Sequence, residues 1–219
     1  MEDKLTRLSK LEQIFSINDY EGIVNENYIY KEGKIPILVS APHAVTHTNK
    51  DNTKFPDSFT GGIALLINEL TDCYVIAKSH NDGIDPNSTN MGMDGGYKEK
   101  IIDIIKEHDI KLLIDLHGLR DDRDTDVDII THYGMTIGHD KSIVEKLMKC
   151  LRENDILNLS EDKYYFAESE KVIVHKIWKV SKIPSIELEI NYHYRNFCKP
   201  DNLIKIVNSL ESFILNYKI

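Results

Sequence analysis

Histidines follow two aliphatic stretches of the sequence at the point where each stretch ends. KLLIDL (111–116) is followed directly by His117, and IPILVS (35–40) is followed within three residues by His43. Imidazole is a common zinc ligand, and zinc in hydrolases usually takes three protein ligands and leaves a fourth position for water. If the two stretches are neighbouring strands, their histidines could meet at one metal ion.

The third ligand of such a site should be a carboxylate, and Asp57 is the candidate. The compact His-x-x-Glu spacing is absent, because Thr46 stands three residues after His43. Asp57 precedes an expected helix start, where a loop could fold back toward His43. The residue types leave other interpretations open, because a lone histidine at a strand end is more often hydrogen-bonded or solvated, and Asp57 could be a helix cap. Competing histidines are His47, His80 and His193.

A pair of acidic residues interrupts another aliphatic stretch. SIELEIN (185–191) places Glu187 and Glu189 two residues apart, on one face of an expected strand. Burying two carboxylates there is costly unless they are paired or functional. The alternative is that this face is partly solvated, or that Lys179 or Lys182 pairs with one of the acids.

The elements that must position these residues alternate between short apolar stretches and amphipathic ones. Strands are expected at 35–40, 73–79, 111–116, 126–133 and 183–190. Helices are expected near 59–70, 97–108, 139–154, 169–181 and 200–216. This alternation predicts a single α/β domain over residues 1–219, with a mostly parallel mixed sheet flanked by helices. Residues 1–30 are expected to form an N-terminal helical segment, and 200–219 a C-terminal helix.

Ligands of such sheets bind outside the carboxyl ends of the strands, where both histidines would lie. Pro42 fixes the backbone just before His43. Gly118 follows His117 and is expected to let the chain turn sharply after the strand.

Composition restricts the class of protein. The chain has 219 residues, of which 41% are hydrophobic, enough for one domain with a sizeable core. The net charge of -9, without a dense Lys/Arg patch, argues against nucleic acid as a partner. No apolar run approaches the ~18 residues of a membrane span, and the amino terminus lacks a secretory apolar region. The three scattered cysteines form no CxxC pair. We therefore expect a cytoplasmic protein without a membrane partner, and the oligomeric state is left open.

Five short motifs resemble, in the same order, those of the N-formylglutamate amidohydrolase family. They are SAPHA (40–44), DSFTGGIALLI (57–67), DPN (85–87), IDLHG (114–118) and IPSIELEIN (183–191). That family is similar in its core to zinc carboxypeptidases and aspartoacylases. The resemblance covers about residues 35–190 and implies a phosphorylase/hydrolase-like, zinc carboxypeptidase-like fold with three layers.

The resemblance also implies roles for individual residues. His43, Asp57 and His117 would hold one Zn²⁺, with another divalent metal as an alternative. Glu189 would be the general base, taking a proton from the attacking water and later delivering one to the leaving amine, and Glu187 a supporting acid. Asp115, two residues before His117, could accept a hydrogen bond from a histidine ring N–H. Alternatively, it is a buried acid bonded to backbone amides.

One departure from the family pattern concerns the substrate. The family motif near residue 85 typically reads Asp-x-Asn-Arg, whereas Ser88 follows Asn87 here. Substrate contacts are therefore expected from Asn87 together with Arg120 and Arg195, because an arginine fork matches a carboxylate. Each arginine could instead be an ordinary surface charge.

The expected activity is zinc-dependent hydrolysis of the C–N bond in a small N-acyl amino acid, N-formyl compounds included, or a similar amide. Two alternatives stay open. One is a metallocarboxypeptidase-like enzyme that cleaves a peptide or a cell-wall fragment. The other is a non-catalytic binding module of the same fold.

Overall fold

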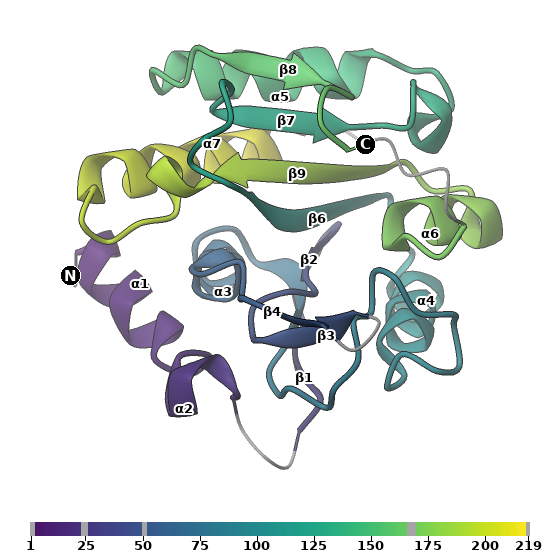
Figure 1. Cartoon of the computed structure of the whole chain (residues 1–219). Coiled ribbons are helices and arrows are strands. Elements are labelled where there is room, and N and C mark those ends of the chain that lie inside the picture. The colour runs from purple at the N-terminus through teal and green to yellow at the C-terminus, as the bar shows by residue number, and fades with distance from the viewer. Residues whose placement is uncertain (1–2, 23–25, 50–51, 166–169, 218–219) are drawn as a thin grey trace.

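Within the described residues, the chain folds around a seven-stranded sheet whose central strands are parallel (Figure 1). The computed structural model describes residues 3–22, 26–49, 52–165 and 170–217. The strand order is β1-β5-β2-β6-β9-β7-β8. The bounds are β1 Tyr28–Lys31, β2 Ile35–Ala41, β5 Cys73–Lys78, β6 Leu112–Leu119, β7 Val127–Ile130, β8 Leu159–Glu161 and β9 Ser185–Asn191. Strand β1 pairs antiparallel with β5, and β7 pairs antiparallel with β9, so the sheet is mixed.

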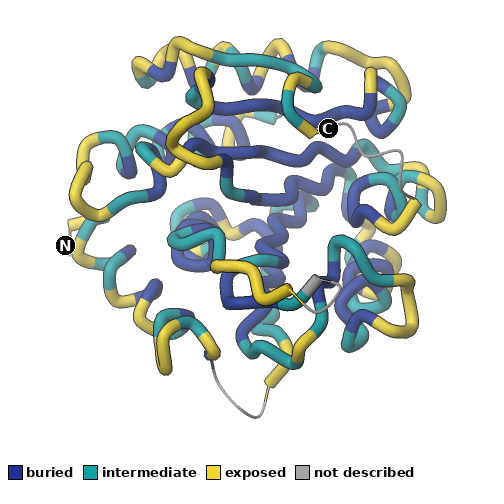
Figure 2. The backbone as a smooth tube through the Cα atoms, in the orientation of Figure 1, coloured by how far each residue is buried: buried dark blue, intermediate teal, exposed yellow. Residues whose placement is uncertain are grey.

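Helices cover both faces of this sheet. Their bounds are α1 Lys4–Glu12, α2 Ile17–Tyr20, α3 Thr60–Thr71, α4 Tyr97–His108, α5 Ser142–Glu153, α6 Ile173–Ser181 and α7 Pro200–Asn216. Helices α1, α3, α5 and α7 pack on one face, and α4 and α6 pack on the other. Figure 2 shows the central strands buried between these two layers. No helix of the described residues is both long and apolar enough to cross a bilayer.

The two faces of β6 and β9 differ in polarity. One face of β6 carries Leu112, Ile114 and Leu116, which are fully buried in the larger apolar core. The opposite face begins with Leu113 and then presents Asp115 and His117. Strand β9 repeats this arrangement, because Asp115 pairs with Glu187 and His117 pairs with Glu189 in the parallel register. The alternating pattern of these strands therefore separates an apolar face from a face that becomes polar toward the carboxyl ends.

The expected fold class is confirmed, and the five expected strands and the helices at 59–70, 97–108, 139–154, 169–181 and 200–216 are found within a few residues. Four short strands were not predicted: β1, β8 and the hairpin of β3 (His47–Asn49) and β4 (Asn52–Lys54). The expected helical segment at 1–30 is helical only in α1 and α2, because residues from Tyr28 onward add an edge strand. The expected bounds that fall on residues 1–2, 23–25, 169 and 218–219 lie outside the described residues.

Strand β6 also runs farther than expected. It continues through His117 and Gly118 to Leu119, so Gly118 makes no turn. A Cβ at Gly118 would lie 2.3 Å from Arg195 Nη2 and 2.5 Å from Asp57 Oδ1. The glycine is required because two side chains approach the strand backbone this closely.

The glycine pair in DSFTGG has a similar explanation. The end of α1 packs against the first turn of α3, and the ring of Phe15 lies over Gly61. A Cβ at Gly61 would lie 2.6 Å from Phe15 Cε2, well inside normal contact distance. The small residue thus lets the N-terminal helix approach the segment that carries Asp57.

We expect Gly61→Ala to lower the free energy of unfolding by about 1–3 kcal/mol, because the added methyl overpacks the contact with Phe15. The loss should occur although alanine alone favours a helix by about 1 kcal/mol over glycine. Urea unfolding measures it, and the same substitution in the Phe15→Leu background should cost less. Equal losses in both backgrounds would contradict the packing explanation.

Candidate metal centre

Three potential ligands converge beyond the carboxyl end of β2 and beside that of β6. His43 Nδ1 and His117 Nδ1 lie 3.1 Å apart, and Asp57 Oδ2 lies 3.3 Å and 3.6 Å from them. Ligands on a tetrahedral zinc ion with bonds of about 2.0–2.1 Å are about 3.3 Å from one another. The three atoms therefore have the spacing that a single zinc ion requires, so the residues present fit the metal.

Local backbone contacts place Asp57 in this group. The Asp57 N–H donates to the carbonyl of His43 at 2.8 Å, which ties the two loops together. The Asp57 carbonyl in turn accepts the backbone N–H and the hydroxyl of Thr60, at the start of α3. The loop between β4 and α3 therefore folds back on the loop after β2, as the sequence position of Asp57 suggested.

Each histidine is held by a carboxylate at its other ring nitrogen. His43 Nε2 lies 2.9 Å from Asp85 Oδ1, and His117 Nε2 lies 3.2 Å from Asp115 Oδ2. A carboxylate acceptor fixes the tautomer with hydrogen on Nε2 and leaves Nδ1 to bind a metal. Asp115 thus lies within hydrogen-bond distance of the His117 ring, where it could accept the ring N–H.

Asp85 was missed by the sequence analysis. The DPN motif was noted for its resemblance, but its aspartate was given no role. Asp85 Oδ1 also accepts the backbone N–H of Asn87 at 2.8 Å, a local turn that Asp-x-Asn sequences favour. The available signal was an aspartate in a loop that follows a predicted strand, at the same sheet edge as the histidines.

The electrostatics of the group favour positive charge at its centre. Burial alone would raise the pKa of Asp57, but hydrogen bonds with His117 and His43 outweigh it and hold that pKa well below its usual range. Burial would likewise lower the pKa of His43, yet its bonds to Asp57 and Asp85 raise it to about 9. Buried carboxylates therefore create a position where a cation is stabilised.

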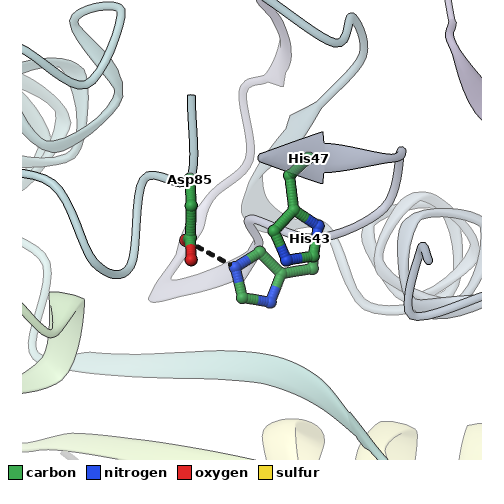
Figure 3. Close-up of side chains that lie close together, drawn as sticks. All are labelled: His43, His47 and Asp85. Atoms are coloured by element: carbon green, nitrogen blue, oxygen red, sulfur yellow. Dashed lines mark hydrogen bonds and ion pairs between the residues drawn. The ribbon is translucent and has the colours of Figure 1, made fainter. Parts of the chain in front are cut away.

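His47 lies next to the group but is poorly oriented to share a metal with His43. Figure 3 shows the two rings face to face, with the hydrogen bond to Asp85 drawn from His43 and none drawn from His47. The ring centroids are 3.8 Å apart and the planes are parallel within 4°. An imidazole nitrogen binds a metal in its own ring plane, so an ion between parallel rings would lie outside both planes. Burial and the neighbouring His43 lower the pKa of His47 to about 4, and it stacks as a neutral ring.

Glu187 and Glu189 lie on β9, beside Asp115 and His117 of β6. Both are buried, 4% and 5% exposed. The alternative of a solvated face is wrong, and so is pairing with either lysine: Lys179 pairs with Glu170, and Lys182 lies over the Trp178 ring.

The two glutamates differ from ordinary surface acids. Burial and the neighbouring Glu187 raise the pKa of Glu189 to about 8, against the lowering effect of His117. Within the described residues, one oxygen of each carboxyl is buried without a hydrogen-bond partner. A buried carboxyl with a free oxygen beside a metal position has the chemistry of a proton acceptor or donor.

The three expected substrate contacts lie in different environments. Asn87 Nδ2 is 3.5 Å from His117 Nε2, and its Oδ1 accepts the N–H of Ile173, so it lies beside the candidate centre. Arg120 is 71% exposed at its side chain and pairs with Asp122 at 2.7 Å. It lines a cavity of about 810 Å³ that Asp57 and Gly118 also line.

Arg195 does not lie free for a substrate carboxylate. It is only 4% exposed, and its guanidinium donates to the backbone carbonyls of Ser58, Leu119 and Ile190. These three bonds join the Asp57 loop to the ends of β6 and β9. Arg195 also lines the 810 Å³ cavity, so it has this structural role, and the substrate contact expected of it stays a prediction.

A second grouping of potential ligands shares His117. Asp115, Glu187 and His117 could gather around an ion through Nε2 of the histidine. These residues are fully buried, whereas Asp57 borders the 810 Å³ cavity. The grouping of His43, Asp57 and His117 is therefore the one that borders an open cavity, through Asp57.

Solved structures share this fold at low sequence identity. No protein-family model and no curated protein sequence matches the chain. N-formylglutamate amidohydrolase from Ralstonia eutropha JMP134 is 12% identical with a TM-score of 0.62, over 86% of this chain and 95% of that chain. A bacteriophage poly-gamma-glutamate hydrolase is 12% identical with a TM-score of 0.56, over 87% and 89%. A metallo-carboxypeptidase from Burkholderia cenocepacia is 10% identical with a TM-score of 0.54, over 96% and 66%.

These likenesses define the class of fold. The chain has the α/β fold shared by amidohydrolases and carboxypeptidase-like proteins, as the five ordered motifs indicated.

We expect Asp85→Asn to weaken zinc binding about 10–100-fold, because an amide is a poorer acceptor for the His43 ring N–H and no longer fixes its tautomer. Titration of the metal-free protein against a competing chelator measures this. Asp103→Asn, at an exposed position of α4, is the control and should bind zinc like the wild type. Equal affinities of the two variants would remove Asp85 from the site.

Proposed function

We propose that the protein is a metal-dependent hydrolase that cleaves an amide C–N bond. His43 and His117, each through Nδ1, and Asp57, through a carboxylate oxygen, would hold one Zn²⁺ or another divalent ion. The observation that carries this proposal is the convergence of these three atoms within 3.6 Å, with a carboxylate behind each imidazole. A bound zinc ion would lower the pKa of a water molecule and polarise the substrate carbonyl.

Glu189 is the proposed general base. It lies on the strand next to His117, directly across the parallel register, with a buried carboxyl oxygen that has no partner among the described residues. It would accept a proton from the attacking water and pass a proton to the leaving nitrogen. Glu187, two residues earlier on β9 and beside Asp115, is farther along the strand from the open cavity and would support the charge of His117.

The proposed substrate is a small N-acyl amino acid or a similar amide. Arg120 and Lys54 are exposed cations that line the 810 Å³ cavity. Arg120 could exchange Asp122 for a substrate carboxylate because that ion pair is exposed. The second candidate function, cleavage of a peptide or cell-wall fragment, is favoured by the cavity itself. Its volume lies in the upper part of the ~300–1,000 Å³ range of pockets for drug-sized ligands. Release of an acid from N-acyl amino acids, or of an amino acid from peptides, separates the two by assay.

Metal analysis tests the proposal directly. Protein purified without chelators should contain about one equivalent of a divalent metal, as expected for one set of three ligands. Removal of the metal should abolish hydrolysis, and zinc should restore it. Less than ~0.2 equivalents, with none taken up on titration, would contradict the metal site. Full metal loading without turnover on any amide tested would favour the non-catalytic module.

The two glutamates should respond differently to the same substitution. We expect Glu189→Gln to keep its zinc and to lose about 10²–10⁴-fold in kcat, because acid–base catalysis is removed. KM should change little, since the lost interaction is made mainly in the transition state. Glu187→Gln is the matched control and should cost less in rate. Steady-state kinetics on one active substrate distinguish the two roles. An inactive Glu187→Gln together with a nearly active Glu189→Gln would assign the base to Glu187, two residues earlier on β9.

A further inference from the structure

The start of α3 has an unusual cap. Phe59, which precedes the helix, adopts the left-handed conformation with φ of 69° and gives no side-chain cap. The carboxylate of Glu12, at the end of α1, takes this place instead. Glu12 Oε1 accepts the N–H of Phe59 at 2.7 Å, and Oε2 accepts the N–H of Gly62 at 3.0 Å. A side chain 47 residues before Phe59 in sequence thus accepts two amides at this helix end, those of Phe59 and Gly62.

The surroundings of Glu12 are built for this contact. Glu12 is only 4% exposed, and the Tyr20 hydroxyl donates to its Oε1 at 2.9 Å. A Cβ at Gly62 would lie 2.7 Å from Glu12 Oε2, so the second glycine of the pair leaves room for the carboxylate. The Glu12 carboxylate can therefore reach the Gly62 N–H only because residue 62 has no side chain.

The capped segment carries a proposed metal ligand. Asp57 lies two residues before Phe59, and between them the Ser58 carbonyl accepts from Arg195 at 2.8 Å. Glu12 holds the amide side of this short loop, and Arg195 holds its carbonyl side. Asp57 itself is tied to the His43 carbonyl. With these bonds in place, the Asp57 carboxylate has little freedom to leave the two histidines.

We propose that Glu12 is a positioning residue for the metal centre: it caps α3 and thereby fixes the loop that presents Asp57. This inference rests on the proposed metal site. It gives a role to the N-terminal helix, which lies outside residues 35–190, where the motifs occur. Helix α1 therefore supports the proposed metal centre and also contributes side chains to the apolar core.

Glu12→Gln tests this role. A glutamine oxygen can accept one of the two amides, but its NH₂ group would face the other, donor against donor. Zinc affinity, measured by chelator competition, should fall about 10–100-fold, as when other supporting groups of a metal site are removed. Leu8→Ala is the matched control, because Leu8 is a fully buried residue of the same helix and belongs to its apolar core. It should lower the thermal midpoint at least as much while zinc affinity stays within about twofold.

The outcomes separate this inference from the proposed function. If Glu12→Gln folds and binds zinc like the wild type, or if Leu8→Ala weakens zinc equally, the positioning role is overturned. If the wild type binds no zinc, the proposed function fails. Amide hydrogen exchange then still tests whether Glu12 caps α3. Protection of the Phe59 and Gly62 amides should then be lost in Glu12→Gln, and retained protection would overturn it. Should Glu12→Gln not fold, Tyr20→Phe keeps the carboxylate and should weaken zinc in the same direction by a smaller factor; unchanged affinity would overturn the inference.

Discussion

The burial of carboxylates and imidazoles costs desolvation free energy, and much of the structure around the candidate site offsets that cost. Asp115, Glu187 and Glu189 are buried on one face of the sheet, and each has an oxygen without a partner among the described residues. Isolated buried charge is strongly unfavourable and must be offset by protons, hydrogen bonds or a cation. The raised pKa of Glu189 and the raised pKa of His43 are two expressions of that cost. A divalent ion among His43, Asp57 and His117 would offset it directly.

Burial of the apolar face of the same strands stabilises the fold and so offsets the unfavourable burial of the polar groups. Ile114 and Leu116 of β6, like Ile186 and Leu188 of β9, are buried in the core formed with α1, α3, α5 and α7. These contacts fix the strands and so set where the polar side chains of the other face lie. Precise positions then come from bonds between loops. Arg195 and Glu12 illustrate this, because each joins segments far apart in the chain through backbone groups.

The resemblance in fold to amidohydrolases and carboxypeptidases leaves substrate recognition to this chain's own residues. Ser88 stands where the family motif has arginine, and its backbone N–H bonds to the Asp85 carbonyl inside the loop. The Arg195 guanidinium donates to three backbone carbonyls, and its contact with a substrate stays a prediction. Arg120 lies at the rim of a cavity that borders Asp57. The proposed site therefore combines a candidate metal centre at the sheet edge with a neighbouring cavity surface that could contact the rest of the substrate.

The sequence by itself determined the features that depend on local pattern. The central strands followed from aliphatic runs and the main helices from amphipathic periodicity, because burial imposes those periods on a chain. His43, Asp57 and His117 could be singled out because each follows or precedes such an element in a recognisable motif. The alternation in SIELEIN placed Glu187 and Glu189 on one face for the same reason.

Only the tertiary structure decided the features that depend on contacts between distant segments. The edge strands β1 and β8 are short and partly exposed, so pairing with a neighbour defines them and their own sequences do not. Asp85 became the acceptor for His43, and Arg195 became a clamp, because loops far apart in sequence meet at one sheet edge. The partner of Glu12 could not be predicted either, because nothing in the sequence around Glu12 indicates which helix end it caps. Residue type and period specify elements, whereas the partner of a buried polar group is set by three-dimensional proximity.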